Sequence, residues 1–276
     1  MNIEKYLNNL LKAEIKPIKT DLGLSNTIYQ FEYNNNKYAL RLPLNEGSKD
    51  HRQLERQIQI KAKSMDFEEF YYDSNSNIRI TKWVDNLMTF SQYSNEDKYD
   101  KAIKRIKQFH KLDIKTDLKF NLKEKYQYFK NNIKNKLFDY EKYEYIIDSY
   151  YKLNTPIVLS HNDLVDGNIC YKDGYCYLID YEYASLNYEY FDLMSLLSEN
   201  RIYDEITRNK IFNIYFGSEI NDEILDQCST IEQAQNLLWA AWANLEYEQK
   251  QKDIYLDIFK DKTNRINILS KKNKFI

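Results

Sequence analysis

Residues 1–85 carry a pattern of hydrophobic and polar positions that is typical of strands and short helices. Two of the strand-like runs are joined by Asn34, Asn35 and Asn36, and asparagine tolerates the positive φ angles of a tight hairpin turn. Two other segments repeat their hydrophobic residues at helical spacing. The predicted strands are Ile28–Tyr33, Lys37–Leu42, Phe67–Tyr72 and Ile78–Val84, and the predicted helices are residues 2–12 and 48–63.

The chain from Asn95 onward is dominated by helical spacing. Hydrophobic residues between positions 102 and 109 fall on one face and predict a helix that ends near His110. The Lys- and Tyr-rich residues 121–152 are interpreted as two further helices. After Asp192 the pattern stays helical almost to the last residue.

A short hairpin interrupts the helical part. Its strands are Cys170-Tyr171 and Tyr175–Ile179, and Asp173-Gly174 is a dipeptide that favours a two-residue turn. The sequence therefore predicts an α+β protein of two lobes, a β-rich lobe at residues 1–85 and a mainly helical lobe at 86–276. A ligand is expected in the cleft where two lobes meet.

Composition narrows the class of protein. The 276 residues have a net charge of -2 with interspersed lysines and acids, so no general attraction to nucleic acid or to an anionic membrane is expected. The first residues lack a signal-peptide cleavage site, and no uncharged apolar run approaches the ~20 residues of a transmembrane helix. These features predict a soluble, cytoplasmic protein, and they leave its oligomeric state open.

The three cysteines show no disulfide framework and no metal-binding spacing. They are Cys170, Cys176 and Cys228, and we interpret them as reduced thiols. The alternative is a disulfide across the hairpin, because Cys170 and Cys176 flank its turn.

The strongest chemical signal is the run Ser160–Asn168, SHNDLVDGN, followed by Leu178-Ile179-Asp180. Phosphoryl transfer from ATP requires a carboxylate near the attacking hydroxyl and oxygen ligands for Mg²⁺. Kinase catalytic loops meet these needs with an Asp, an Asn five residues later and an Asp after a hairpin. Asp163 then orients or deprotonates the hydroxyl, Asn168 and Asp180 hold Mg²⁺, and His161 braces the loop.

The sequence resembles the choline/ethanolamine kinases, within the wider aminoglycoside-phosphotransferase-like group. The segments that carry the resemblance are LSHNDLVDGNI (159–169), LIDYEYASLNYEYFDL (178–193) and LLWAAWANLEYE (237–248). The likeness is specific over residues 159–260 and looser over 20–110. It implies a protein-kinase-like fold and an ATP- and Mg²⁺-dependent kinase of a small alcohol.

The resemblance also implies nucleotide contacts in the N-terminal lobe. The segment Gly23–Thr27 is similar to the loop that covers the phosphates, which points to Ser25, Asn26 and Thr27. Arg41 stands where the family carries a basic residue on the ATP phosphates, and Glu55 on the next helix is expected to pair with it. Trp83 and Val84 lead into the hinge beside adenine, with core packing as the alternative for Trp83.

Two tryptophans indicate the acceptor. Trp239 and Trp242 share a helix face, and aromatic faces bind quaternary ammonium groups that cannot donate a hydrogen bond. The family presents a similar W-x-x-W pair to choline, whereas packing in the core is the alternative. The resemblance adds Glu199 and Tyr255 as substrate contacts. Tyr203, one helical turn after Glu199, is expected to add an aromatic wall, and Tyr183 and Glu182 are further candidates.

Choline is therefore the predicted acceptor, with phosphocholine as the product. The alternatives are ethanolamine, an aminoglycoside or another amino alcohol, and a non-catalytic binding protein on a kinase scaffold. The retained set Asp163, Asn168 and Asp180 argues against the last. His51 is interpreted as a surface residue and His110 as a helix end, and neither is expected to act in the mechanism.

Overall fold

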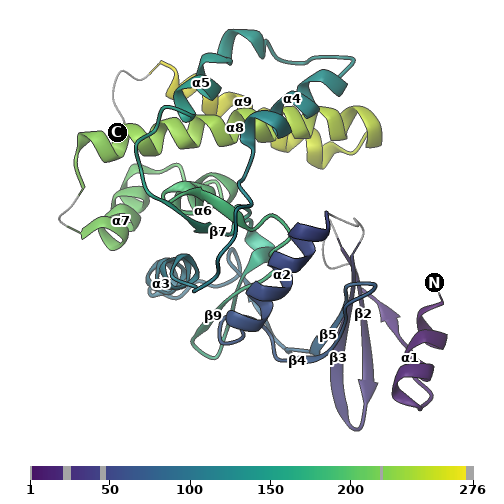
Figure 1. The fold of residues 1–276 in the computed structure, drawn as a ribbon. Coiled ribbons are helices and arrows are strands. Elements are labelled where there is room, and N and C mark those ends of the chain that lie inside the picture. Colours follow the sequence, from purple (N-terminus) through teal and green to yellow (C-terminus); the bar gives the residue numbers. More distant parts are fainter. Residues whose placement is uncertain (1, 21–25, 44–47, 218–219, 272–276) are drawn as a thin grey trace. The chain divides into compact units, whose positions relative to one another are not determined.

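The computed structural model describes residues 2–20, 26–43, 48–217 and 220–271 (Figure 1). It divides into two compact units. Unit 1 consists of residues 1–95, 112–114 and 166–182, and unit 2 of residues 96–111, 115–165 and 183–276. The expected lobe boundary at residue 85 stays a prediction, because units of packing and functional lobes are different divisions. None of the described helices is long and apolar enough to cross a membrane.

Unit 1 is built on a five-stranded antiparallel sheet of order β1-β2-β3-β5-β4. Its central hairpin turns at Asn34 and Asn35, whose φ angles of 49° and 61° confirm the predicted asparagine turn. The strands are β1 (Ile18–Lys19), β2 (Asn26–Tyr33), β3 (Asn36–Pro43), β4 (Glu69–Asp73) and β5 (Ile78–Lys82). The last two are shifted by one or two residues at their ends from the predicted runs.

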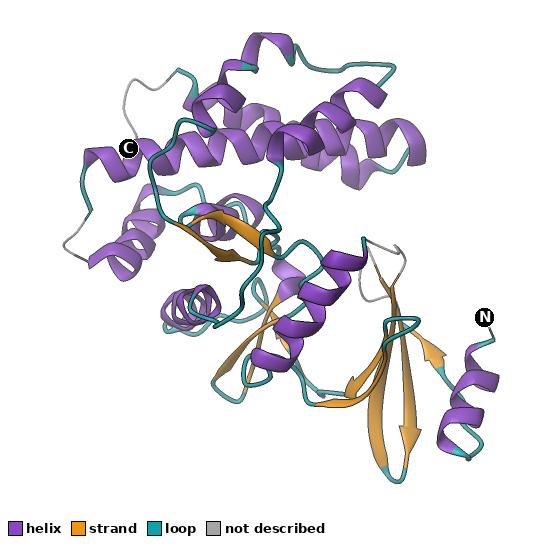
Figure 2. Cartoon of the chain, in the orientation of Figure 1, coloured by secondary structure: helices purple, strands orange, loops and turns teal. Residues whose placement is uncertain are grey.

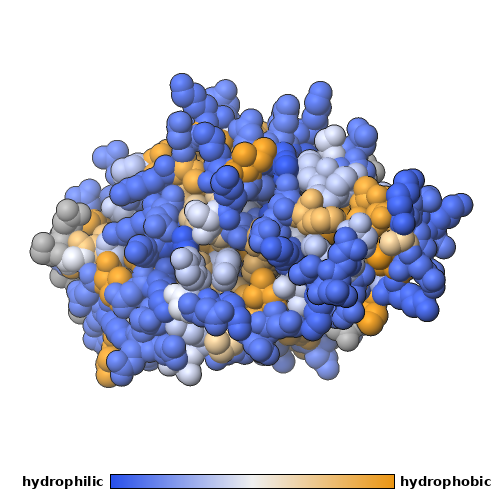
Figure 3. All heavy atoms as spheres, turned by 90° about the horizontal axis from the view of Figure 1, so that it is seen from below, coloured by the Kyte–Doolittle hydropathy of each residue, from blue (hydrophilic) through white to orange (hydrophobic). Residues whose placement is uncertain are grey.

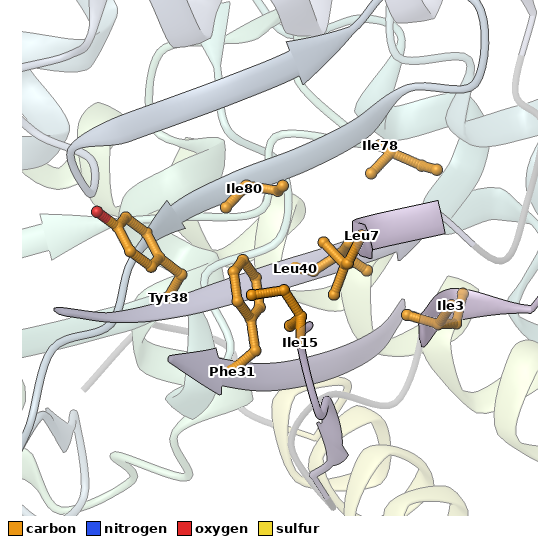
Figure 4. Packing of buried hydrophobic residues seen from close by; sticks show 8 residues of the cluster. All are labelled: Ile3, Leu7, Ile15, Phe31, Tyr38, Leu40, Ile78 and Ile80. Carbon is orange, nitrogen blue, oxygen red and sulfur yellow. The ribbon is translucent and has the colours of Figure 1, made fainter. Parts of the chain in front are cut away.

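Helix α1 (Ile3–Leu11) supplies part of the core of unit 1. Figure 4 shows Ile3 and Leu7 of this helix directed toward side chains of the sheet. The sheet residues of this cluster are Phe31, Tyr38, Leu40, Ile78 and Ile80, and Ile15 completes it. Each fully buried side chain of this kind contributes roughly 1.5–3 kcal/mol. Helix α2 (Lys49–Lys61) begins at Ser48, whose hydroxyl accepts a hydrogen bond from the His51 N–H.

A second, three-stranded sheet belongs to unit 1 and has the order β6-β8-β9. The predicted hairpin is formed by β8 (Ile169–Lys172) and β9 (Tyr175–Leu178), and β6 (Met88–Thr89) pairs with β8. Asp173 and Gly174 both have positive φ at its turn. Cys170 pairs in register with Tyr177 rather than with Cys176, and the three cysteines are buried and form no disulfide.

Unit 2 is mainly helical, as Figure 2 shows. Its helices are α3 (Lys98–His110), α4 (Leu122–Asn132), α5 (Tyr145–Tyr150), α6 (Phe191–Glu199), α7 (Glu205–Phe216), α8 (Asp222–Lys250) and α9 (Asp253–Leu269), with the 3₁₀ turn η1 (Glu141–Tyr143). The two strands β7 (Ile157–Ser160) and β10 (Ser185–Tyr188) form an antiparallel pair. Figure 3 shows one face of the protein, on which hydrophilic residues predominate and hydrophobic residues are scattered.

Residues 121–152 contain the two predicted helices, α4 and α5, but residues 133–140 between them are irregular. Three of their backbone N–H groups donate to side chains of α8. Glu248 accepts hydrogen bonds from the N–H groups of Lys134 and Asn135, and Asn244 accepts one from Leu137. Helical spacing in a sequence does not reveal such partners, which come from more than 100 residues away along the chain.

Candidate active site

The segment around Asp163 is held from both sides in unit 2. It follows the buried end of β7, and Asp163 is half-buried between the buried residues Asn162 and Leu164. The Leu164 N–H donates to the Ser195 hydroxyl of α6 over 3.1 Å. Asn200 donates to the Leu164 carbonyl over 2.9 Å. The backbone after the candidate catalytic carboxylate is therefore fixed by two side chains.

The backbone before Asp163 is fixed by a buried carboxylate. The Asp192 Oδ2 accepts from the His161 N–H, and its Oδ1 accepts from the Asn162 N–H, each over 2.8 Å. Asn162 has a φ of 67°, a left-handed conformation that asparagine tolerates. Its amide donates to the Tyr183 carbonyl and to the Ser185 hydroxyl. A strained residue that is bonded this thoroughly is typical of a preorganised loop.

His110, for which no role in the mechanism was predicted, completes this arrangement. Its Nε2 lies 2.9 Å from the same Oδ2 of Asp192, and the histidine side chain is 6% exposed. Burial acts to raise the pKa of Asp192, but the hydrogen bonds and charges of His110 and His161 together outweigh it and lower this pKa overall. The sequence signals for this pair are a histidine at the end of the amphipathic helix α3 and an aspartate in the first turn of α6.

The hairpin of unit 1 explains the spacing between Asn168 and Asp180. Ile169 and Leu178 are paired at its open end, and the Ile179 N–H donates to the Asn168 carbonyl over 3.1 Å. Asn168 therefore lies next to the residue that precedes Asp180. Asp180 itself has a φ of 67°. Two oxygen-bearing side chains twelve positions apart in sequence are thus brought to one end of the hairpin.

Arg41 joins the strand β3 to this end of the hairpin. Its Nη1 donates to Glu55 over 2.7 Å, and its Nη2 donates to Asp180 over 2.9 Å. The expected pairing of Arg41 with Glu55 is therefore confirmed. Burial acts to lower the pKa of Arg41, but the carboxylates of Asp180, Glu55 and Glu182 outweigh it and raise this pKa. The guanidinium is a permanent positive charge that is suited to phosphate oxygens.

The donor set of unit 1 fits Mg²⁺. Asn168 offers an amide oxygen and Asp180 a carboxylate, both of them hard oxygen ligands. Within the described part of the chain no cluster of three or more His, Cys, Asp or Glu residues is placed to hold a metal. Mg²⁺ differs from structural metals in this respect, because one or two protein ligands suffice when phosphates and water complete its shell.

The structure describes some of the other residues that were predicted to contact the nucleotide. Trp83 follows β5 directly, is half-buried, and donates its indole N–H to Asp85 over 3.1 Å. Its backbone N–H donates to the carbonyl of Lys37 in β3 over 3.0 Å. Val84 is also half-buried, and Thr27 lies in β2. Ser25 and the side chain of Asn26 lie outside the described residues.

Four predicted substrate residues form a row of aromatic rings in unit 2. Tyr183 and Trp239 have ring centroids 6.4 Å apart, Trp239 and Trp242 6.1 Å, and Trp242 and Tyr255 5.6 Å. All three contacts are edge-to-face. Both tryptophans are half-buried, whereas the alanines between and beside them on α8 are buried. The helix therefore turns its alanines into the core and leaves part of each indole accessible.

Two lysines lie over the ends of this aromatic row. The Lys125 Nζ is 5.1 Å from the centre of the Tyr183 ring, and the Lys250 Nζ is 5.2 Å from that of Tyr255. Lys250 also forms an ion pair with Glu246, one turn earlier on α8. These positions show that the rings already accept cations at cation–π distance.

Glu199 and Tyr203 contact a different set of side chains. Glu199 forms an ion pair with the buried Lys262 over 2.9 Å. Tyr203 donates its hydroxyl to Asp261 over 2.9 Å, and the Arg265 guanidinium lies 4.9 Å from its ring centre. The carboxylate predicted to balance a substrate cation therefore has a cation of the protein beside it, which the sequence did not reveal.

The sequence model of choline/ethanolamine kinase matches residues 16–216, well over half of the chain. The chain belongs to the choline/ethanolamine kinase family. The resemblance seen in the sequence is thereby confirmed.

Curated relatives in the choline/ethanolamine kinase family have two kinds of name. The protein LicA of Haemophilus influenzae is 24% identical over 193 residues, covering 64% of this chain and 56% of its own length. A probable ethanolamine kinase of Arabidopsis thaliana is 28% identical over 172 residues, covering 50% of this chain and 46% of its own length. The matches thus span about half the length of these relatives. Of these two names, the second states an acceptor and the first does not.

Solved structures share the fold over almost the whole chain. A choline/ethanolamine kinase family protein of Mesorhizobium loti has a TM-score of 0.77 at 16% identity, covering 96% of this chain and 90% of its own. The choline kinase LicA of Streptococcus pneumoniae has a TM-score of 0.73 at 19% identity, covering 96% and 98%. A structure of LicA in complex with AMP has a TM-score of 0.75 at 20% identity, covering 97% of each chain. The predicted α+β, protein-kinase-like fold class is confirmed.

Proposed function

We propose that this chain transfers the γ-phosphate of ATP to the hydroxyl of choline. The observation that carries the acceptor is the half-buried aromatic row of Tyr183, Trp239, Trp242 and Tyr255. A quaternary ammonium makes no hydrogen bond and gains from aromatic faces about 0.5–2 kcal/mol or more. A nucleotide as co-substrate is supported by the similar structure that holds AMP.

Each group has a role in the proposed reaction. Asp163 accepts the proton of the acceptor hydroxyl, and the hydroxyl oxygen forms a bond to the γ-phosphorus. The bond from that phosphorus to the bridging oxygen of ADP breaks, and Arg41 balances charge on the phosphates. Asn168 and Asp180 would hold Mg²⁺, which when bound supplies further neutralisation of phosphate charge. The protein contributes mainly positioning and charge balance.

The contacts of Glu199 favour a quaternary over a primary ammonium. A primary ammonium donates three hydrogen bonds and would require carboxylates that are not already paired. Glu199 is 13% exposed at its side chain and is paired with Lys262. Ethanolamine is nevertheless the second candidate acceptor, because several curated relatives are named ethanolamine kinase.

A series of acceptors tests this choice. With Mg-ATP, the kcat/KM for ADP release is expected to rise from ethanolamine through its N-methyl and N,N-dimethyl derivatives to choline, about tenfold in total. Each methyl group replaces a hydrogen-bond donor by a surface that aromatic rings bind. The opposite order would make ethanolamine the acceptor. Turnover of an aminoglycoside alone would refute the aromatic row as the acceptor site. Nucleotide binding without turnover of any alcohol would favour a non-catalytic binding protein.

Trp242→Ala is expected to raise the KM for choline by about 10- to 30-fold and the KM for ATP by less than twofold. Trp242 lies between Trp239 and Tyr255, so its loss opens the row at its centre. Trp242→Phe should recover part of the lost affinity, since it restores an aromatic face. Tyr247→Ala on the same helix is the control and should change neither KM. Equal changes in both KM values would indicate a packing role for Trp242.

A further inference from the structure

Helix α2 buries one polar side chain that the proposed reaction does not use. Gln59 is 5% exposed and neighbours the buried Ile58 in a helix whose remaining glutamines, Gln53 and Gln57, are exposed. A buried amide is costly unless it is hydrogen-bonded. The burial of Gln59 therefore requires a structural or functional reason.

Charged neighbours determine how the Gln59 amide is oriented. Its Nε2 donates to the Glu55 Oε1 over 3.2 Å, and its Oε1 accepts from the Arg56 Nη1 over 3.3 Å. The opposite orientation would place the amide NH₂ against a guanidinium and the amide oxygen against a carboxylate. Gln59 thus connects a positive and a negative side chain in the only orientation that satisfies both.

On one side, this connection extends into the sheet. Arg56 donates two hydrogen bonds to Glu69 at 2.6 and 2.8 Å. Arg79 of β5 donates to the same Glu69 over 3.1 Å and to Asp66 over 2.8 Å. Arg79 and Asp66 are 9% and 1% exposed at their side chains, which makes this end of the network rigid.

On the other side, the connection ends at Arg41. One oxygen of Glu55, Oε1, accepts from both Gln59 and Arg41. Arg41 also donates to Asp180, whose carboxylate is a candidate Mg²⁺ ligand. A cation bound to the Asp180 carboxylate weakens the attraction between this carboxylate and the Arg41 guanidinium. Glu55 then becomes the main anchor of the guanidinium, and Gln59 is the neutral group that holds this anchor in place.

We propose that Gln59 is a positioning residue that orients Arg41 for the phosphates of ATP by fixing the carboxylate of Glu55. The α2 polar network consists of Asp66, Arg79, Glu69, Arg56, Gln59, Glu55 and Arg41. It ties the orientation of Arg41 to strands β4 and β5 rather than to α2 alone. This inference rests on the proposed role of Arg41 at the nucleotide.

Gln59→Met tests the inference, because methionine keeps the length of the side chain and removes both hydrogen bonds. Binding of ATP, measured by calorimetry on the full chain, is expected to weaken about 3- to 10-fold, as for loss of one hydrogen bond of ordinary strength. The KM of Gln59→Met for the acceptor should stay within twofold of the wild-type value. Gln57→Met, at an exposed position of the same helix, is the matched control and should bind ATP as the wild type does.

A double-mutant cycle separates positioning from a general structural effect. If Gln59 acts through Arg41, adding Gln59→Met to Arg41→Met should not weaken ATP binding further. An additive effect, or unchanged ATP affinity in Gln59→Met alone, would overturn the proposal. If Gln59→Met does not fold, Arg56→Met at the half-exposed neighbour replaces it in the same cycle. A wild type that binds no ATP would refute the proposed function instead.

Discussion

Asp163→Asn is expected to lower kcat by about a thousandfold while the affinity for ATP stays within twofold, since a general base contributes roughly 10²–10⁴. Asparagine has the shape of aspartate but does not accept the hydroxyl proton at neutral pH. The neighbours of Asp163 are fixed by Asp192, Ser195 and Asn200, so the loop should keep its conformation in the variant. Steady-state kinetics of ADP release and calorimetric titration with ATP measure the two quantities.

Asp173→Asn is the matched control for this experiment. Asp173 lies at the hairpin turn with a φ of 47°, a conformation that asparagine adopts as readily as aspartate. Its turnover should therefore equal that of the wild type. Turnover of Asp163→Asn within tenfold of the wild type would refute the assignment of Asp163. Joint loss of ATP binding and of the folded state would instead give this residue a structural role.

Asp192→Asn is expected to destabilise the fold by about 3 kcal/mol and to reduce kcat together with it. The carboxylate is buried and accepts hydrogen bonds from the N–H groups of His161 and Asn162, with His110 as a third partner. An asparagine amide accepts through only one of its two polar atoms, so at least one donor would face its NH₂ group. Thermal unfolding and kcat are the measurements, and the KM for ATP should change little.

The pH dependence of this loss distinguishes the carboxylate from a simple packing residue. Asp192 has a pKa below its ordinary value of 3.8 in the folded protein. Its stabilisation is therefore complete above about pH 4 and is lost as the pH falls through the lower, folded-state pKa. The difference in unfolding free energy between wild type and Asp192→Asn should be largest at neutral pH and should shrink below pH 4.

The control for Asp192→Asn is Asp253→Asn in the first turn of α9. Asp253 is exposed, so it shares the favourable position at a helix N-terminus but lacks the buried hydrogen bonds. Its substitution should change stability by less than 1 kcal/mol at any pH, as is usual for exposed groups at a helix terminus. A similar loss in both variants would mean that the helix dipole, not the loop, accounts for the effect of Asp192.

The amino-acid sequence by itself determined the elements whose signals are local. Asn34 and Asn35 specify a turn because they tolerate positive φ, and Asp173-Gly174 specifies the second hairpin for the same reason. The spacing from Asp163 through Asn168 to Asp180 indicated kinase chemistry. The hairpin between Asn168 and Asp180 has a set length, so it determines how far apart these two residues are in the sequence. The family resemblance and the fold class followed from such segments.

Apart from the Arg41–Glu55 pair, only the tertiary structure decided which side chains are partners. Lys262 approaches Glu199, and His110 approaches Asp192, across 63 and 82 positions of the chain. The irregular path of residues 133–140 has the same cause, since its backbone bonds to α8. The burial of Gln59 is equally invisible in a pattern of glutamines on one helix. Hydrogen bonds and ion pairs depend on distance in space, and a sequence encodes that distance only through the complete fold.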